Sequence, residues 1–250
     1  MDLVVTLGGD GTVLYTSSLF QNRVPPVVPF HLGSLGFLTI FEKSTYAAVL
    51  GDILDGKPQF VNMRMRLEAQ VYQNPEPEGS GLGKLVFSRK VLNEVVVDRG
   101  QHSTMVNLDL YGDGYHITSV LADGLVVATP TGSTAYNLSA GGPLVHPSKS
   151  SVLVTPICPH ALTTRPMILP SSLELKLTVS PDARGSAWVS FDGRDRFELD
   201  EGSSVVIRTA VQSPFPSICR ETNWFQGLVS SLGWNVRARQ KRNVSPSVKL

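Results

Sequence analysis

The spacing of apolar residues changes near Pro58, and this change constrains the fold of the 250-residue chain more than any other feature. Before Pro58, strand-like apolar runs alternate with segments of helical spacing. The strand-like runs are 3–7 and 27–30, and the helical segments are 12–22 and 46–54. Alternating strands and helices favour a parallel sheet. Residues 1–58 are therefore predicted to form a partial α/β domain.

From about Gln59 onward, apolar residues recur at every second position. The alternating segments are 106–110, 173–179 and 205–207, and a Gly-Asp-Gly turn at 112–114 leads into a further apolar segment at 117–120. Half-buried antiparallel strands have this pattern. Residues 59–212 are therefore predicted to form a β-rich, sandwich-like domain. The remaining segment, 213–250, contains helical spacing and is expected to pack back on the first domain.

The composition argues against several classes of partner. The net charge is +1 at pH 7, which gives no electrostatic basis for binding nucleic acid or an anionic membrane. No apolar run approaches the roughly 18 residues that a membrane span needs. The two cysteines, Cys158 and Cys219, are too few for a disulfide framework and fit a reducing compartment. We therefore expect a cytoplasmic protein with small-molecule partners, and neither nucleic acid nor a membrane among them.

A glycine-rich motif, Gly8-Gly9-Asp10-Gly11-Thr12, follows the first predicted strand and opens the first predicted helix. Its glycines allow a ligand to approach the backbone, and the helix N-terminus favours a phosphate. Asp10 would ordinarily repel phosphate, so it needs a reason to be there, such as accepting a proton from a hydroxyl nucleophile or holding a metal. The alternative is a tight turn with an aspartate helix cap. The motif alone resembles the phosphate loops of NAD kinases and of diacylglycerol and sphingosine kinases.

A second polar constellation spans residues 123–136, which read as a strand, a Pro-Thr-Gly turn and a helix start. The hydroxyls of Thr131, Ser133 and Thr134 cluster where a polar ligand could dock. Tyr136 offers a flat face on which a base could stack, although a tyrosine is more often part of a core.

Asn93 and Glu94 lie inside the apolar run 91–97, and we interpret them as residues of a strand. An amide and a carboxylate there need partners if they are buried, and vicinal ribose hydroxyls are suitable ones. The alternative is a simple polar pair at a strand edge.

Together, these blocks resemble the NAD kinase family over nearly the whole chain. The resemblance rests on GGDGT at 8–12, Asn-Glu at 93–94, and DGLVVATPTGSTAYNLSAGG at 123–142. The segments 155–160, 165–166 and 189–194 look like its eukaryotic cytosolic branch. Diacylglycerol and sphingosine kinases share only the first block.

The resemblance implies a role for each matching residue. Asp10 would be the general base, and Gly8, Gly9, Gly11 and Thr12 would line the phosphate pocket. The residues implied in NAD binding are Phe37, Asn93, Glu94, Asp123, Thr131, Thr134, Ala135, Tyr136, Ser139 and Asp192. Sequence context alone makes Asp192 a turn residue.

The activity that the resemblance implies is transfer of the γ-phosphoryl of ATP to the 2′-hydroxyl of the adenosine ribose of NAD. Magnesium is expected on the ATP phosphates, because phosphoryl transfer depends mostly on positioning and charge neutralisation. The five histidines show no metal-ligand spacing, so no structural zinc and no metal ligand from the protein are expected. A homo-oligomer, dimer or tetramer, is expected through the β-rich domain.

The family normally carries a further strand and helix ahead of the glycine motif. Two alternatives therefore stay open: a truncated, catalytically weak or inactive subunit that binds NAD or NADP, and a lipid kinase of the diacylglycerol or sphingosine type. The sequence also leaves open NADH as acceptor, polyphosphate as donor, and regulation.

Overall fold

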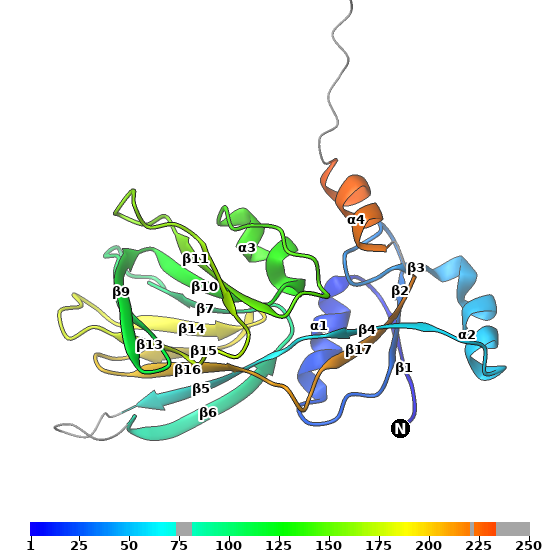
Figure 1. Cartoon of the computed structure of the whole chain (residues 1–250), viewed down its shortest axis with the longest axis horizontal. Helices are drawn as coiled ribbons and strands as arrows, with labels where there is room; N and C mark the ends of the chain where they lie inside the picture. Colours follow the sequence, from blue (N-terminus) through cyan, green and yellow to red (C-terminus); the bar gives the residue numbers. More distant parts are fainter. Residues whose placement is uncertain (74–81, 221–222, 234–250) are drawn as a thin grey trace, which may run out of the picture.

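The computed structural model describes residues 1–73, 82–220 and 223–233. They form two lobes that lie along the long axis of the molecule (Figure 1). Residues 234–250 of the predicted C-terminal segment lie outside the described residues. None of the described helices has the length and apolar character needed to cross a membrane.

The first lobe is built on a five-stranded sheet in the order β1-β2-β17-β4, with β3 paired to β2. Its strands are β1 (Val4–Leu7), β2 (Val27–His31), β3 (Phe41–Glu42), β4 (Phe60–Arg64) and β17 (Phe215–Cys219). Its helices are α1 (Asp10–Leu19), α2 (Tyr46–Leu54), α4 (Asn223–Leu232) and a 3-10 turn, η1 (Lys43–Thr45). β1, β3 and β17 run parallel to β2, and β4 runs antiparallel to β17. The predicted boundary at 58/59 lies just before β4 in the sequence. In the structure, however, β4 pairs with β17 and belongs to the sheet of the first lobe.

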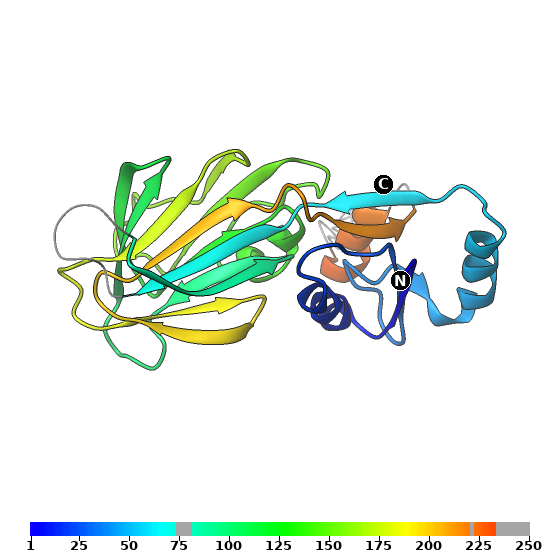
Figure 2. The ribbon, with the colours of Figure 1, turned by 90° about the horizontal axis from the view of Figure 1, so that it is seen from below.

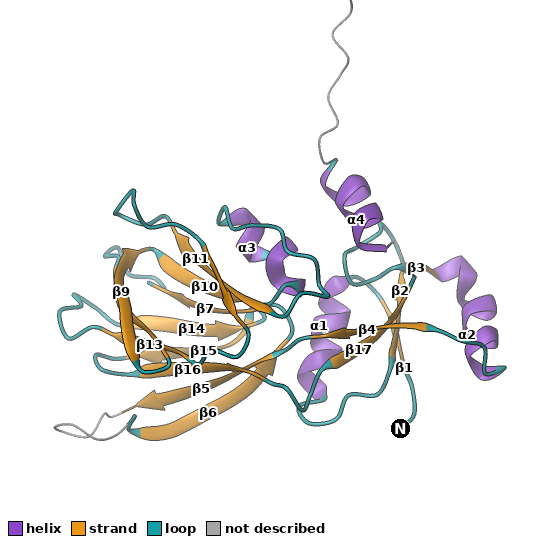
Figure 3. Cartoon of the chain, in the orientation of Figure 1, coloured by secondary structure: helices purple, strands orange, loops and turns teal. Residues whose placement is uncertain are grey.

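Both faces of this sheet are covered by apolar side chains, in two separate clusters. Val27 of β2 packs with Val13 of α1 on one face. Its neighbour Val28 faces the other side, where Val49 and Ile53 of α2 pack. This division follows from strand geometry, because successive side chains point to opposite faces. Figure 3 shows α1, α2 and α4 in this lobe, whereas α3 lies against the other lobe.

The second lobe consists of two six-stranded sheets whose paired strands are antiparallel. The first has the order β6-β5-β16-β13-β8-β9 and the second β12-β11-β10-β7-β14-β15. The first sheet comprises β5 (Leu67–Gln73), β6 (Lys84–Val91), β8 (Val106–Gly112), β9 (Tyr115–Ala122), β13 (Leu175–Val179) and β16 (Ser204–Thr209). The second comprises β7 (Glu94–Asp98), β10 (Gly124–Ala128), β11 (Ser151–Ile157), β12 (Met167–Pro170), β14 (Ala187–Phe191) and β15 (Arg194–Leu199). A 3-10 turn, η2 (Thr131–Thr134), and the short helix α3 (Tyr136–Ser139) follow β10.

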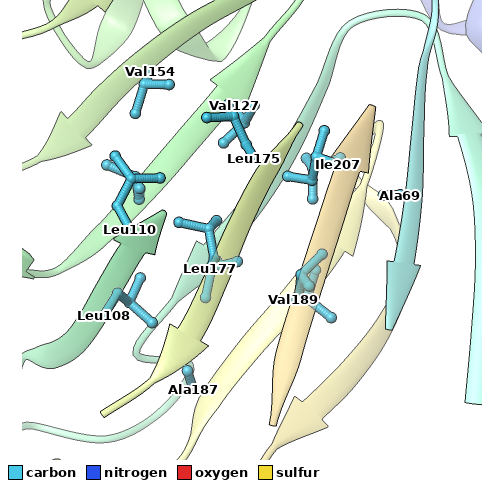
Figure 4. Packing of buried hydrophobic residues seen from close by; sticks show 14 of the residues in the cluster. Ala69, Leu108, Leu110, Val127, Val154, Leu175, Leu177, Ala187, Val189 and Ile207 are labelled. Atoms are coloured by element: carbon cyan, nitrogen blue, oxygen red, sulfur yellow. The ribbon is translucent and has the colours of Figure 1, made fainter. Parts of the chain in front are cut away.

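The two sheets enclose one continuous apolar core (Figure 4). Leu110, Leu177 and Ile207 come from the first sheet, and Val127 and Val189 come from the second. Each of these five residues lies either in a strand where apolar residues recur at every second position or in the buried apolar run that follows Asp123. The predicted fold class, a parallel-containing α/β part followed by a β-rich sandwich, is confirmed.

Two chain connections join the lobes: β4 leads into β5, and β16 leads into β17 (Figure 2). Arg66, which is fully buried, lies in the first connection. Its Nε donates to the carbonyl of Ser213 at 2.7 Å, and its Nη1 donates to the carbonyls of Phe20 at 2.7 Å and Ser17 at 3.2 Å. The guanidinium thereby satisfies carbonyls at the C-terminal end of α1 and in the second connection.

Candidate functional site

Asp10 is the first residue of α1, directly after β1, where the glycine motif predicted a helix start. Among the described residues, its carboxylate accepts hydrogen bonds from one loop, residues 37–39. Oδ1 accepts from the N–H of Leu38 at 3.0 Å, the N–H of Thr39 at 3.1 Å and the hydroxyl of Thr39 at 3.0 Å. Oδ2 accepts from the N–H of Phe37 at 2.9 Å. Since each carboxylate oxygen has about two acceptor positions, Oδ2 retains one for a hydroxyl ligand.

The loop can approach Asp10 this closely because position 36 is glycine. A Cβ on Gly36 would lie 2.1 Å from Oδ1 of Asp10 and 2.6 Å from Oγ1 of Thr39. No side chain fits there without displacing the carboxylate or the loop.

The glycine motif itself is closely packed at one end and open at the other. A Cβ on Gly8 would lie 2.1 Å from Oγ1 of Thr12, whereas a Cβ on Gly9 or Gly11 would meet nothing within 4 Å. Gly9 caps α1 without a side-chain hydrogen bond. The first turn of α1 therefore presents an open backbone, beside Asp10, on which a phosphate could dock.

Asn93 and Glu94 lie at a bend, and the prediction that they both sit within a strand is wrong for Asn93. β6 ends at Val91 and β7 begins at Glu94. The cause is Asp192, a positive-φ turn residue (φ 49°) remote in sequence. Its carboxylate accepts from the N–H groups of Leu92 and Asn93 at 2.8 Å and of Glu94 at 3.0 Å. Asp192 thus orients the bend, and these three donors engage both of its carboxylate oxygens.

The side chains of Asn93 and Glu94 are buried, yet each has an atom without a partner. Oδ1 of Asn93 and Oε2 of Glu94 accept no hydrogen bond from the described residues. Burial, with a further contribution from the Asp192 carboxylate, raises the pKa of Glu94 to about 8, while the N–H of Tyr136 opposes the shift. Burial also raises the pKa of Asp192, but its three N–H donors and Arg66 oppose this. Glu94 therefore holds a proton near pH 7, and its carboxyl group can donate as well as accept.

The Pro-Thr-Gly turn packs directly against this bend. The hydroxyl of Thr129 donates to the carbonyl of Leu92 at 2.6 Å, and the N–H of Thr129 donates to the carbonyl of Asn93 at 2.8 Å. A Cβ on Gly132 would lie 2.3 Å from the same Asn93 carbonyl. The hydroxyl of Thr134 bonds within the turn, to the carbonyl of Thr131 at 3.3 Å.

The residues after the turn face outward. Ala135 and Tyr136 follow η2, Ser139 is exposed on α3, and Tyr136 is 43% exposed. Burial of its hydroxyl raises the pKa of Tyr136, and the Asp98, Asp123 and Glu94 carboxylates add to the shift. The tyrosine ring is therefore available to a ligand, while its hydroxyl lies in a negative field.

Asp123 lies away from the Asn93–Glu94 bend. It forms an ion pair with Arg99 at 3.0 Å. It immediately precedes β10, at the end of this strand that is far from the Pro-Thr-Gly turn. Glu94 and Asp98 face opposite ends of β10 in the strand register, so the two ends lie about 13 Å apart. Asp123 thus lies at the other end of β10 from Glu94.

Arg64 of β4 links the two motifs. It is 7% exposed, its Nη1 donates to the hydroxyl of Thr131 at 3.3 Å, and the Asp10 carboxylate acts on it electrostatically. Arg64 also lines a cleft of about 560 Å³ between the lobes, together with Phe37 and residues of β17, α4 and the 146–148 loop. Arg64 therefore lies between the glycine motif and the Pro-Thr-Gly turn.

The sequence interpretation missed three residues of this site: Gly36, Thr39 and Arg64. A signal was present for Arg64, because Arg64 and Arg66 alternate with Met63 and Met65 in a run where apolar residues recur at every second position. Two arginines on one side of an extended segment indicate cations that need specific partners if they are buried.

Comparison with known proteins identifies the family of both lobes. Residues 1–58 match the ATP-NAD kinase N-terminal domain, and residues 92–217 match the ATP-NAD kinase C-terminal domain. Two Saccharomyces cerevisiae proteins, an ATP-NADH kinase and an NAD(+) kinase, are each 49% identical to this chain over 248 residues. These alignments cover 96% of this chain but 50% and 46% of the relatives. The chain therefore spans about half the length of these curated relatives.

Solved structures show the same relationship. A crystal structure of yeast NADH kinase complexed with NADH superimposes with a TM-score of 0.88 at 35% identity. The match covers 97% of this chain and 69% of that one. An NAD kinase from Archaeoglobus fulgidus in complex with ATP has the same fold, with a TM-score of 0.72 at 24% identity over 90% of this chain and 81% of that one. The matched domains, the cleft motifs and the structural similarity all agree: the chain belongs to the ATP-NAD kinase family.

Proposed function

We propose that the protein is an NAD kinase that transfers the γ-phosphoryl of ATP to the 2′-hydroxyl of the adenosine ribose of NAD. The observation that carries the proposal is the position of Arg64. It lies between Asp10 of the glycine motif and Thr131 of the Pro-Thr-Gly turn. Arg64 therefore connects the possible base to the Pro-Thr-Gly turn, which packs against the proposed ribose-binding bend.

The β-rich lobe supplies the groups for the acceptor. The unpartnered Oδ1 of Asn93 and the carboxyl group of Glu94 suit vicinal ribose hydroxyls. Beside them, Ala135 and Tyr136 would hold the adenine, with Thr131, Thr134 and Ser139 close by. Phe37 would contact the same nucleoside from the loop that holds Asp10.

The far end of this surface would take the nicotinamide side. Asp123 is the proposed contact there, about 13 Å along the sheet from Glu94. That separation suits two nucleosides joined by a pyrophosphate. Asp192 would act indirectly, by orienting the backbone of the 92–94 bend.

In the reaction, the 2′-oxygen of the ribose forms a bond to the γ-phosphorus, and the bond from that phosphorus to the β,γ-bridging oxygen breaks. The products are NADP and ADP. Oδ2 of Asp10 has an acceptor position left and would receive the hydroxyl proton. Such a base typically contributes ~10²–10⁴-fold, and the remaining catalysis comes from positioning. Gly9 and Gly11 leave the backbone beside Asp10 open to the transferred phosphate.

A divalent cation such as Mg²⁺ would be carried by the ATP phosphates, where it neutralises charge. Asp10 is the one carboxylate within the glycine motif itself. The described part of the chain contains no group of three or more His, Cys, Asp or Glu that could hold a metal. Arg64, which is cationic at pH 7, adds positive charge of the protein's own to the cleft.

The proposal is tested by incubating the purified chain with ATP, Mg²⁺ and either NAD or NADH. Formation of NADP is read through an NADP-specific dehydrogenase, and NADPH is measured directly by chromatography. We expect turnover with NAD. Parallel reactions with diacylglycerol and sphingosine should give no phospholipid product.

Two outcomes would contradict the proposal. Folded protein that binds NAD without turnover would favour a binding subunit that works with other chains. Phosphorylation of a lipid alcohol, but not of NAD, would favour a lipid kinase.

The proposal extends to assembly and compartment. We propose a homo-oligomer that associates through the β-rich lobe, where Tyr115, Ile117 and Leu121 of β9 are exposed. The two free cysteines suit the cytoplasm. Light scattering of the purified chain tests the assembly, and a monomer at assay concentration would contradict it.

A further inference from the structure

We propose that Gln21 is a positioning residue, which docks the C-terminal end of α1 on the β-rich lobe and thereby sets the distance between Asp10 and the Asn93–Glu94 bend. This inference rests on the proposed function, which assigns the base to Asp10 and the acceptor ribose to the bend. It adds to that function the contact that holds the two groups at a fixed separation. The support comes from three contacts between α1 and the β-rich lobe.

Helix α1 runs from the glycine motif to the junction between the lobes. It has 10 residues, so it is about 15 Å long. Asp10 is its first residue, and Gln21 lies two positions beyond its last residue, Leu19. A shift or tilt at the Gln21 end is transmitted to the Asp10 carboxylate, because the backbone hydrogen bonds of a short helix make it move as one body.

Gln21 pairs with the edge of β6 as a neighbouring strand would. β6 is the outermost strand of its sheet, so the outward backbone groups of Lys90 have no strand partner among the described residues. Oε1 of Gln21 accepts from the N–H of Lys90 at 2.7 Å, and Nε2 of Gln21 donates to the carbonyl of Lys90 at 3.3 Å. Nζ of Lys90 donates to the carbonyl of Gln21 at 2.8 Å. Lys90 stands three positions before Asn93, so this pairing fixes α1 next to the acceptor bend.

Arg66 holds the same end of α1. Its Nη1 donates to the carbonyls of Ser17 and Phe20, and its Nε donates to the carbonyl of Ser213 in the connection between β16 and β17. Burial lowers the pKa of Arg66 to about 10, and the Asp192 carboxylate opposes this. The guanidinium is therefore charged at pH 7, and it acts both on α1 and on the residue that orients the bend.

A third contact lies along the side of α1. The guanidinium carbon of Arg194 lies 5.0 Å from the centre of the Tyr15 ring. Arg194 begins β15, two positions after Asp192. The helix therefore touches both chain segments that meet at the bend. Undocking α1 would leave the two binding surfaces intact but would change their separation, and a displacement of about 1 Å can slow a reaction ~10²-fold.

The test compares Gln21→Met with a matched control, Gln73→Met. Methionine keeps the length of glutamine but cannot bond the Lys90 backbone. We expect kcat for NADP formation to fall about tenfold, since Arg66 still holds α1 in part, while the Kd values for NAD and MgATP, measured by calorimetry, stay within about twofold. Gln73 donates to the carbonyl of Glu198 at 3.0 Å inside the β-rich lobe, so Gln73→Met loses a similar bond and should keep the kcat of the parent.

Two further variants sharpen the test. Gln21→Glu keeps the acceptor for the Lys90 N–H and should lose less than about threefold in kcat. Tyr15→Leu, at a side chain that is 48% exposed, serves if Gln21→Met fails to fold, and its kcat should fall about threefold. A merely structural contact would lower the free energy of unfolding and leave the kcat of the folded variant unchanged. Unchanged kcat in folded Gln21→Met, or in Tyr15→Leu if that is the variant that folds, would overturn the proposal.

Hydrogen exchange of the unmodified chain tests the docking without turnover. The Lys90 amide should exchange slowly although it faces outward from a sheet edge, because it bonds Gln21. Rapid exchange would overturn the proposal even if the chain forms NADP. If the Lys90 amide is protected but the chain forms no NADP, the proposed function fails and the positioning role fails with it, while the docking of α1 stands.

Discussion

The two lobes hold their polar site groups by different means. In the β-rich lobe, one apolar core joins two sheets, and the Asn93–Glu94 bend is fixed by backbone hydrogen bonds to Asp192 and Thr129. In the α/β lobe, two small apolar clusters lie on opposite faces of the sheet, and Asp10 is held by hydrogen bonds from the 37–39 loop. The difference is that the proposed acceptor bend is held by residues anchored in the two-sheet core, whereas the proposed base is held by one short loop. Substitutions in the two lobes should therefore change different quantities.

The largest expected effect is on stability, from the β-rich core. Leu177 is 2% exposed between β8 and β16. Leu177→Ala should lower the free energy of unfolding by about 4 kcal/mol, because it removes buried methyl groups and leaves a cavity. Denaturant unfolding measures this. Leu54→Ala on α2, at a side chain that is 83% exposed, is the control and should change stability by less than about 0.5 kcal/mol. Equal losses in the two variants would contradict the contrast between the lobes.

A second effect depends on pH and arises at the acceptor bend. The pKa of Glu94 is raised from 4.5 to about 8 in the folded protein. Between these values the folded chain keeps a proton that the unfolded chain loses, so the stabilising contribution is complete below pH 4.5 and is lost as pH rises through about 8. Between these two pKa values, each unit of pH therefore lowers the free energy of unfolding by about 1.4 kcal/mol.

Glu94→Gln should remove this part of the pH dependence. Unfolding of the parent and the variant at several pH values from 5 to 9 would measure it, with exposed Glu201→Gln as the control. A Glu94→Gln variant whose stability falls with pH as the parent's does would show that Glu94 is ionised in the fold.

The smallest of the three effects concerns the loop that holds Asp10. Thr39 is fully buried, and its hydroxyl donates to Oδ1 of Asp10 at 3.0 Å. Thr39→Val keeps the shape but removes one of the carboxylate's four hydrogen bonds. We expect kcat for NADP formation to fall about tenfold, since a hydrogen bond to a charged group contributes about 1.5 to 3 kcal/mol and this one orients the proposed base. The KM for NAD should stay within twofold.

Thr39→Ser retains the hydroxyl and should restore most of the activity. A Thr39→Val variant that raises KM for NAD and leaves kcat unchanged would place Asp10 in binding instead of positioning.

The sequence predicted the elements of the fold better than their partners. Period-two spacing predicted the strands at 106–110 and 173–179, because one side of each faces a core. The position of β4 could not be predicted in the same way. Its pairing with β17 joins residues about 150 positions apart, and the alternation of β4 resembles that of the strands after it.

The site shows the same limit. The glycine motif identified Asp10, because a carboxylate in a phosphate loop needs a chemical reason. The bend at Asn93 escaped prediction, since its cause is Asp192, about 100 residues away in sequence. Thr39 and Gly36 were missed because their role is visible only once the loop lies against Asp10. Ion pairing of Asp123 with Arg99 likewise depends on the tertiary fold.

The most direct test of the account compares NAD binding with turnover in Asp10→Asn. The asparagine keeps the size of the side chain and can still accept from Leu38 and Thr39, but it cannot receive a proton. Calorimetry gives the NAD affinity, a coupled assay gives NADP formation, and exposed Asp55→Asn serves as the control. We predict that turnover falls by more than about 10²-fold while the Kd for NAD stays within about twofold. Retained turnover, or loss of NAD binding along with turnover, would contradict the assignment of chemistry to Asp10 and of acceptor binding to the β-rich lobe.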